Sequence, residues 1–363
     1  MRLVLCGDLT PTDYTKPYFE KKDIPALFGQ LPEVFDTADR VIVNLECALT
    51  TSDNAIKKFG PNLKADPICA EALKEAGITD CGLSNNHIFD FGKDGLMDTI
   101  SHLEQNDIFW TGVGENDAES RKLHIMQIGD KKVALITVCE HEYTYALPDR
   151  IGANPYDPYL TMEDIRKAKA EADYVIVMYH GGKEHCRYPS PRLRKLCQAM
   201  VKNGADVVLC QHSHCIGCYE KYEGSHILYG QGNFHFVKYI DSEGWHSGLV
   251  VVLDIEDDIN ISFIPTIENE DGSGIELALG EEKEKLLAEF EERNKHLETD
   301  QWLAGWEEFC ESVRKPYISS ISKAYTENSD ERSNHHFAHY LDCEAHTDVW
   351  RTLCKTWNHT NEK

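Results

Sequence analysis

The segment VVLCQHSHCIGCYEKYEGSHILYGQGNF, residues 207–234, places two histidines, His212 and His214, directly after a short apolar run. The run Val207–Cys210 is β-branched and apolar and is bounded by polar residues, which is typical of a buried strand. In an extended backbone residues i and i+2 point the same way, so the two imidazoles can reach one small volume, as metal ligands do. A lone His-x-His pair more often lies in a surface loop, and the metal-site interpretation therefore depends on the other strand ends.

Other predicted strands also end in a side chain that could bind a metal ion. Asp8 follows the strand Leu3–Cys6, and Glu46 follows Val41–Val43. Asn85, Asn86 and His87 follow Thr79–Leu83, His180 follows Tyr174–Tyr179, and Asn233 follows Ile227–Tyr229. In open α/β sheets, binding sites form outside the carboxyl ends of the strands. Six strand ends of this kind, counting the one that carries His212 and His214, predict that these side chains converge although they span more than 200 residues.

Predicted helices alternate with these strands, which indicates an α/β class, or α+β by strand pairing. The helix expected at Asp66–Ala76 has a proline one residue after its first position and a glycine just past its end. Further helices are expected at Asp94–Gln105, Met162–Ala172 and Pro191–Asn203, and a hairpin is expected from Gly248–Ile255 and Ile259–Ile264.

The composition changes after residues 271–274, which read DGSG, so we expect a first domain over residues 1–274 and a helical C-terminal extension over residues 275–363. Glu281–Leu297 is expected to be a charged helix with an apolar face. We expect the extension to pack on the first domain and to cover the cleft at the strand ends. Its histidines fit a solvated helix face better than a second metal site, and they are His335, His336, His339 and His346.

The composition narrows the class of partner. A formal charge of -25 argues against binding to nucleic acid or to anionic membrane surfaces, because a protein needs a basic face to bind either of them. No stretch approaches the roughly 20 apolar residues that cross a bilayer. No secretory signal is recognisable, and 13 cysteines, an odd number, fit a reducing compartment, so we expect a cytoplasmic protein without a membrane partner. Cys215 and Cys218 invite a redox interpretation, but thiols in such loops are usually bystanders.

The predicted set mixes carboxylates, amides and imidazoles without a thiolate, which suits a pair of divalent ions such as Mn²⁺, Fe²⁺ or Zn²⁺ better than a structural zinc site. Two such ions about 3.5–4 Å apart can activate water and hold the oxygens of a phosphoryl group. The sequence therefore predicts metal-dependent chemistry on a phosphate ester.

Six motifs resemble the CapA family in order and approximate spacing, over about residues 1–265. They are Gly7-Asp8, Asn44-Leu45-Glu46, Asn85-Asn86-His87-x-x-Asp90-x-Gly92, His180-Gly181-Gly182-x-Glu184, His212-x-His214 and Gly232-Asn233-Phe234. That family is named for bacterial poly-γ-glutamate capsule synthesis and resembles the calcineurin-like metallophosphoesterases. The resemblance implies a sandwich of two β-sheets flanked by helices, with a di-metal centre at the strand ends.

The resemblance also implies roles for single residues. Asp8 and His214 would bind one metal ion, Asn86, His180 and His212 the other, and Glu46 would bridge the two. His87 would be the general acid that protonates the leaving oxygen, oriented by Asp90. The remaining candidates would contact substrate or support the ligands, and they are Asn85, Glu184, Arg187 and Asn233.

Two positions depart from ordinary phosphoesterases. Thr10 stands where those proteins have a histidine, and Glu46 stands where they have a bridging aspartate, so one metal site has a ligand fewer. We expect a hydrolase that acts on a small phosphorylated substrate. The alternatives are a cytoplasmic component of poly-γ-glutamate capsule synthesis and a non-catalytic metal-binding module.

Overall fold

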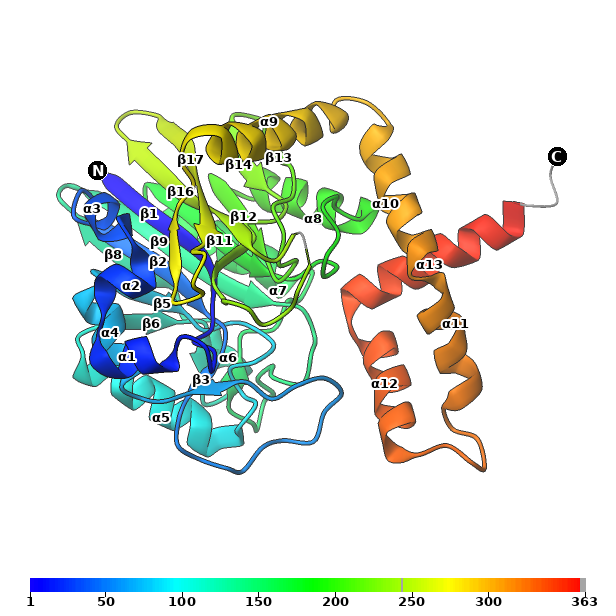
Figure 1. The fold of residues 1–363 in the computed structure, drawn as a ribbon. Helices are drawn as coiled ribbons and strands as arrows, with labels where there is room; N and C mark the ends of the chain where they lie inside the picture. The colour runs from blue at the N-terminus through cyan, green and yellow to red at the C-terminus, as the bar shows by residue number, and fades with distance from the viewer. Residues whose placement is uncertain (243, 360–363) are drawn as a thin grey trace.

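The strands build two large sheets that pack face to face in the computed structural model, which describes residues 1–242 and 244–359 (Figure 1). In order across the first sheet the strands are β18 (Ile275–Leu277), β17 (Ile259–Glu268), β16 (Ser247–Ile255), β1 (Arg2–Leu9), β2 (Arg40–Leu45), β5 (Asp80–Gly82) and β6 (Phe109–Thr111), with β15 (Asn233–His235) also paired to β1. The second sheet runs β13 (Tyr219–Tyr222), β14 (Ser225–Leu228), β12 (Val207–Gln211), β11 (Tyr174–His180), β9 (Lys131–Cys139) and β8 (His124–Ile128).

Two short strand pairs and a set of helices complete the body around the sheets. The pairs are β3 (Ala48–Leu49) with β4 (Lys64–Ala65), and β7 (Val113–Gly114) with β10 (Gly152–Ala153). The helices are α1 (Lys16–Lys21), α2 (Ile24–Phe28), α3 (Leu31–Phe35), α4 (Cys69–Glu75), α5 (Gly92–Gln105), α6 (Asp117–Ser120), α7 (Leu160–Glu171) and α8 (Pro191–Lys202).

Alternation of side chains along the buried strands explains the layers. Leu3 and Leu5 of β1 point inward and share one core cluster with Leu135 and Ile176 of the second sheet. Val4, between them, belongs to a different cluster under α1 to α5. Because successive strand residues face opposite sides, each sheet is buried on both faces and a helix layer covers each outer face. The predicted fold class, two sheets flanked by helices, is confirmed.

The strand directions bring the carboxyl ends to one edge. In the first sheet β1, β2, β5 and β6 are parallel, and in the second β9, β11, β12 and β14 are parallel. Parallel neighbours end on the same side, so the residues after them meet there. The expected hairpin is β16 with β17. Sequence patterns missed the three short helices α1 to α3, each of which has proline in its first turn.

Five helices follow β18 within the described residues, namely α9 (Gly280–His296), α10 (Gln301–Ser312), α11 (Arg314–Lys323), α12 (Glu331–Asp342) and α13 (Glu344–His359). β18 pairs with β17, and Phe290 of α9 is buried in the core cluster between the sheets. Helices α10 to α13 lie to one side of the body (Figure 1). A division at residue 274 thus stays a prediction, and the structure shows β18 and α9 packed on the sheets. No helix in the described parts of the chain is both long and apolar enough to cross a bilayer.

The start of α13 is held against the body by charged contacts. Glu344 Oε1 lies 2.6 Å from Nδ1 of His141, which follows β9. Asp348 Oδ2 accepts from Nε of Arg192, at the start of α8, at 2.8 Å. Phe59, in the loop between β3 and β4, stacks on His336 of α12 with ring centroids 4.1 Å apart. The extension therefore lies against the edge where the parallel strands end.

A buried ion pair at the opposite strand edge gives a test of the sheet. Arg40 Nε donates to Asp80 Oδ2 at 2.7 Å, and the Asp80 side chain is 2% exposed. Burial alone would raise the pKa of Asp80, but hydrogen bonds from His124, Arg40 and Thr79 lower it below its ordinary value. Asp80→Asn should lower the free energy of unfolding at pH 7 by about 1–3 kcal/mol, because it leaves Arg40, which is partly exposed, without its counter-charge.

The pH dependence follows from the sign of that shift. A carboxylate with a lowered folded-state pKa stabilises the fold above about pH 4 and loses that contribution as the pH falls through the folded-state pKa. The difference between wild type and Asp80→Asn in urea unfolding should therefore shrink below pH 4. Asp254→Asn is the control, because its pair with Arg2 is more than 40% exposed on both sides and should contribute less than about 1 kcal/mol. Equal losses in both variants would contradict the prediction.

Candidate metal centre

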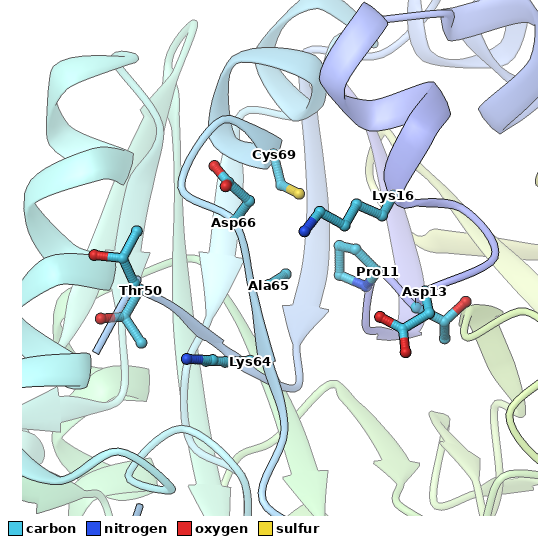
Figure 2. A pocket seen from close by; sticks show the side chains of 10 residues that line it. Pro11, Asp13, Lys16, Thr50, Lys64, Ala65, Asp66 and Cys69 are labelled. Carbon is cyan, nitrogen blue, oxygen red and sulfur yellow. The ribbon is translucent and has the colours of Figure 1, made fainter. Parts of the chain in front are cut away.

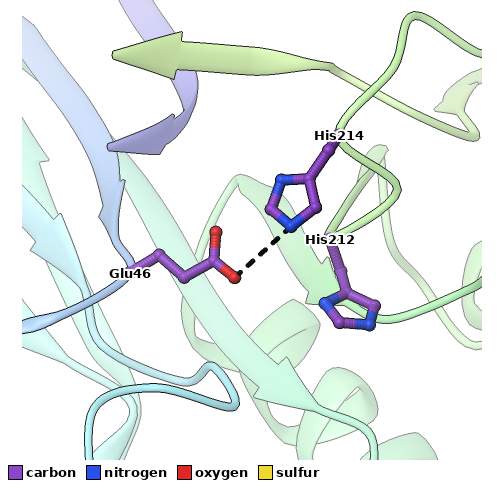
Figure 3. A group of neighbouring side chains, drawn as sticks. All are labelled: Glu46, His212 and His214. Carbon is purple, nitrogen blue, oxygen red and sulfur yellow. Dashed lines mark ion pairs between the residues drawn. The ribbon is translucent and has the colours of Figure 1, made fainter. Parts of the chain in front are cut away.

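Glu46 occupies the middle of the strand-end cluster. It follows β2 directly, its side chain is fully buried, and neither carboxylate oxygen has a hydrogen-bond partner among the described residues. Its Oε1 lies 3.3 Å from Nε2 of His180 and 3.9 Å from Nε2 of His214. Figure 3 shows the carboxylate pointing toward His212 and His214, which come from the loop after β12. A carboxylate in this position is set to bind a cation.

Asp8, near the end of β1, joins the same cluster from the neighbouring strand. Its Oδ1 lies 3.6 Å from Nδ1 of His180, and its Oδ2 lies 3.6 Å from Nδ1 of His214. Asn44, which belongs to the Asn44-Leu45-Glu46 motif but was given no role among the predicted site residues, donates from Nδ2 to Asp8 Oδ1 at 2.7 Å. Ligand atoms of Asp8, Glu46 and His180 all lie within 4.8 Å of one another, as do those of Glu46, His212 and His214.

His212 and His214 converge by a different backbone route from the expected one. Their φ angles are 79° and 52°, in the left-handed region, and not in extended backbone. The backbone N–H of His212 donates to Asp8 Oδ2 at 2.9 Å, which fixes the turn. Non-glycine residues in this region carry strain, and such strain is concentrated at functional sites. The expectation that the two rings share one volume is met, but the extended backbone expected at these two residues is wrong.

Three asparagines lie in or beside the ligand set. Asn233 Oδ1 lies 2.9 Å from Nδ1 of His214, and its Nδ2 donates to the Trp245 carbonyl. Asn85 Nδ2 donates to the Leu45 carbonyl at 2.8 Å, which ties the third strand end to the second. Asn86 Oδ1 lies 3.0 Å from Nε2 of His180. The amide of Asn86 and the ring of His180 are therefore neighbours, as the predicted ligand set requires.

His87 and Asp90 form a pair beside the cluster. His87 Nδ1 lies 2.7 Å from Asp90 Oδ2, and Asp90 is fully buried. Lys58, from the loop between β3 and β4, also contacts Asp90 and lies 3.2 Å from His87 Nδ1, with only 3% of its side chain exposed. Lys58 was missed because it lies in a loop without periodic pattern. The carboxylate of Asp90 is thus shared between an imidazole and a buried ammonium group.

Glu142, which the sequence prediction also missed, lies on the other side of the histidines. Its Oε2 accepts from Nδ2 of Asn86 at 2.9 Å, and its Oε1 lies 3.5 Å from Nε2 of His212. It comes shortly after β9, a strand of the predicted kind, so the same strand-end pattern could have found it. Glu142 extends the cluster toward the C-terminal helices.

Burial strongly shifts the pKa values of the carboxylates and imidazoles in the cluster. Burial and the charge of Glu46 raise the pKa of Asp8 to about 7, and burial raises the pKa of Glu46 to about 7. Burial lowers the pKa of His180 to about 4, so this ring is neutral at pH 7. Burial would also lower the pKa of His212, but Glu142 and other carboxylates raise it to about 10. His212 therefore interacts most strongly with Glu142, and its charge also lowers the pKa of Glu46 against the larger effect of burial.

Two predicted residues form ion pairs outside the ligand set, although the charge of Glu184 still acts on Glu46 and His212. Glu184 is 3.1 Å from Nζ of its neighbour Lys183. Arg187 faces Glu289 of α9 at 4.0 Å and lines a surface hollow with Glu268. These contacts are those of ordinary ion pairs, and a substrate role for either residue stays a prediction.

A separate surface pocket of about 300 Å³ lies between the segment that follows β1 and the residues next to β3 and β4. Lys16, Lys64, Asp13 and Asp66 are among its lining residues, and Figure 2 shows their charged ends around it. Lys64 is already paired with Asp53 at 2.8 Å. The predicted site residues do not line this pocket, so it is distinct from the strand-end cluster.

The residues present fit a divalent metal ion. Two buried carboxylates, neutral imidazole nitrogens and an amide oxygen are donors that first-row divalent ions accept. The orphaned oxygens of Glu46 are the observation of this structure that points to a cation, because a buried carboxylate without a partner is costly unless it binds a cation or is protonated. The identity of the ion is not fixed by the donor set.

Comparison with known proteins places the chain among capsule proteins. The capsule biosynthesis protein CapA of Bacillus anthracis is 28% identical over 254 residues, which are 68% of this chain and 61% of that protein. The PGA biosynthesis protein CapA of Bacillus subtilis strain 168 is 29% identical over 249 residues, 66% of this chain and 63% of that protein. A hypothetical protein from Thermus thermophilus, known from its crystal structure, is 16% identical with a TM-score of 0.46, covering 73% of this chain and 98% of that one.

The chain spans about three fifths of the length of these two curated relatives. The family model described as bacterial capsule synthesis protein PGA_cap matches residues 2–238, which include every ligand predicted from the strand ends. That match covers more than half of the 363 residues, and the chain belongs to the PGA_cap family of bacterial capsule synthesis proteins.

Proposed function

We propose that this protein is a metal-dependent hydrolase of phosphate esters. The observation that carries the proposal is the Glu46 carboxylate, which is fully buried between His180 and His214 and has no hydrogen-bond partner among the described residues. Bound divalent ions would supply charge neutralisation and Lewis-acid polarisation of a phosphoryl oxygen. A small phosphorylated substrate suits this role.

In this proposal the chain's own residues are metal ligands, residues that orient those ligands, and a proton donor. Asp8, Glu46, Asn86, His180, His212 and His214 would hold the ions, two if both positions fill. Asn44, Asn85 and Asn233 orient the ligands by hydrogen bonds to Asp8, the Leu45 carbonyl and His214. Ligands fixed in this way by outer hydrogen bonds keep their geometry when the ion binds.

His87 is the proposed donor of a proton to the leaving oxygen. Its Nδ1 is held by Asp90, so Nε2 is the nitrogen left to face a substrate. Asp90 is itself anchored by Lys58 and by the backbone N–H of Leu63 at 2.7 Å. A positioned imidazole of this kind typically contributes about 10²–10⁴-fold in rate.

A second candidate is an accessory role in poly-γ-glutamate capsule synthesis. The names of the two Bacillus relatives favour it, since both are called capsule or PGA biosynthesis proteins. In that role the metal centre would serve binding, and no ester would be cleaved. Purified, metal-loaded protein tested across phosphomonoesters and phosphodiesters separates the two, because no hydrolysis in any class would favour the accessory role.

Glu46→Gln tests the metal centre directly. A neutral amide of the same shape binds cations weakly, so we expect less metal per chain by elemental analysis of protein purified without chelator. Relative to the wild type, the thermal stability of the variant should change in opposite directions without and with metal. Stripped of metal, the variant should melt at or above the temperature of the wild type, because a buried charge has been removed. With Mn²⁺ or Zn²⁺ added, the melting temperature of the wild type should rise more than that of the variant.

Glu220→Gln is the matched control for that experiment. Glu220 is also largely buried, but it lies on β13, outside the cluster, and is paired with Arg194 at 2.7 Å. Its substitution should reduce stability to the same extent with and without metal. Unchanged metal content in Glu46→Gln, or in the double variant His212→Ala with His214→Ala, would place the metal elsewhere.

His87→Ala tests the acid role. It should retain metal, because His87 is not a proposed ligand, while kcat on an alkyl phosphate falls by about 10²–10⁴-fold. A nitrophenyl ester, whose leaving group needs no proton, should lose much less. Equal losses on the two substrates would remove His87 from this role, and loss of metal would make it a ligand.

A further inference from the structure

A second cluster of metal-binding side chains lies at the corner between α12 and α13. His339 is in the last turn of α12, Cys343 is the residue between the helices, and His346 is in the first turn of α13. The spacing His-x₃-Cys-x₂-His places the three side chains together at the corner. Cys343 is 1% and His346 is 4% exposed, so the expectation of a solvated face is wrong for His346.

The corner meets Glu142 of the body at short range. Ligand atoms of Glu142, Cys343 and His346 all lie within 4.8 Å of one another. Cys343 Sγ is 3.4 Å from Glu142 Oε1. His339 Nε2 is 3.0 Å from Nε2 of His346. Three donor groups, from Glu142, Cys343 and His346, therefore surround one small volume, and His339 adjoins it through His346.

The orientation of His346 suits a ligand. Its Nδ1 is hydrogen-bonded to the buried hydroxyl of Tyr317 on α11. When Nδ1 donates to that oxygen, Nε2 keeps its lone pair and points at His339 and the rest of the cluster. A metal-bound histidine commonly uses its second nitrogen in this way, which fixes the ring and its tautomer.

We propose that Glu142, Cys343, His346 and His339 bind one Zn²⁺ ion. One thiolate, two imidazoles and one carboxylate make a four-ligand set of the kind zinc accepts in structural sites. This site differs from the Glu46 centre, where the candidate ligands within the described residues include no cysteine. It goes beyond the proposed hydrolase, because its role is to join the C-terminal helices to the body.

Glu142 connects the two sites. While Oε1 faces Cys343, Oε2 accepts from the amide of Asn86 in the Glu46 centre. A zinc ion on Glu142 would thus fix the position of α12 and α13 relative to the strand ends. The pairs of Glu344 with His141 and of Asp348 with Arg192 hold α13 without metal, and the stacking of Phe59 on His336 holds α12. Removal of the ion is therefore expected to loosen the corner and leave the helices in place.

Cobalt substitution tests the site without any assay of activity. Co²⁺ added to metal-stripped, full-length protein should produce the thiolate-to-cobalt charge-transfer absorption, and Zn²⁺ should abolish it by displacement. Cys343→Ala should lose the absorption. Cys354→Ala is the control, since Cys354 is an exposed cysteine on α13, and it should keep the absorption. The measurement on the wild-type protein requires no substitution, so a misfolded variant cannot account for its result.

Absence of the absorption in the wild type, or its persistence in Cys343→Ala, would overturn the proposal and leave Cys343 as a thiol hydrogen-bonded to Glu142. Glu46→Gln separates this site from the other centre. It should keep the thiolate absorption while it loses metal at the strand ends, whereas Cys343→Ser should lose one equivalent of zinc and keep the metal at Glu46. Loss of the absorption in Glu46→Gln would mean one merged centre and would also contradict the proposal.

Discussion

The buried carboxylate of Glu46 is the constraint around which the strand ends are arranged. Desolvation of a charge without a partner costs several kcal/mol, and the nearest imidazoles do not compensate, because burial keeps His180 and His214 neutral. Asp8 adds a second carboxylate at the end of the next strand. The sandwich thus collects two buried carboxylates at one edge, where they could hold a metal ion together with the histidines.

The fold and much of the site could be predicted because two simple patterns agree. Strands that are buried on both faces are continuous apolar runs, and their last residues are visible as polar interruptions such as Glu46 and His180. Parallel pairing then brings those interruptions to one edge. Backbone conformation was harder to predict, since only the tertiary contact between Asp8 and the N–H of His212 explains the left-handed turn.

Other parts of the site could not be found by pattern. Lys58 lies in a loop whose sequence has no periodicity. Its importance comes from its contact with Asp90, which lies 32 residues further along the chain. The helix pattern of α12 and α13 correctly indicates a polar face, but it does not say what lies against that face. Here the body presents Glu140 and Glu142, so histidine and cysteine become buried partners of carboxylates.

The pairing of β1 has a consequence for how the protein is made. Leu3 pairs with Leu253 on β16, and Asp8 pairs with Asn233 on β15, so the neighbours on that side of β1 are synthesised more than 200 residues after it. Until then the nascent chain carries an apolar strand with an open edge, a state prone to misassociation. Contacts so distant in sequence also slow folding. Asp8 can therefore take its place beside Asn233 only after more than 200 further residues have been synthesised.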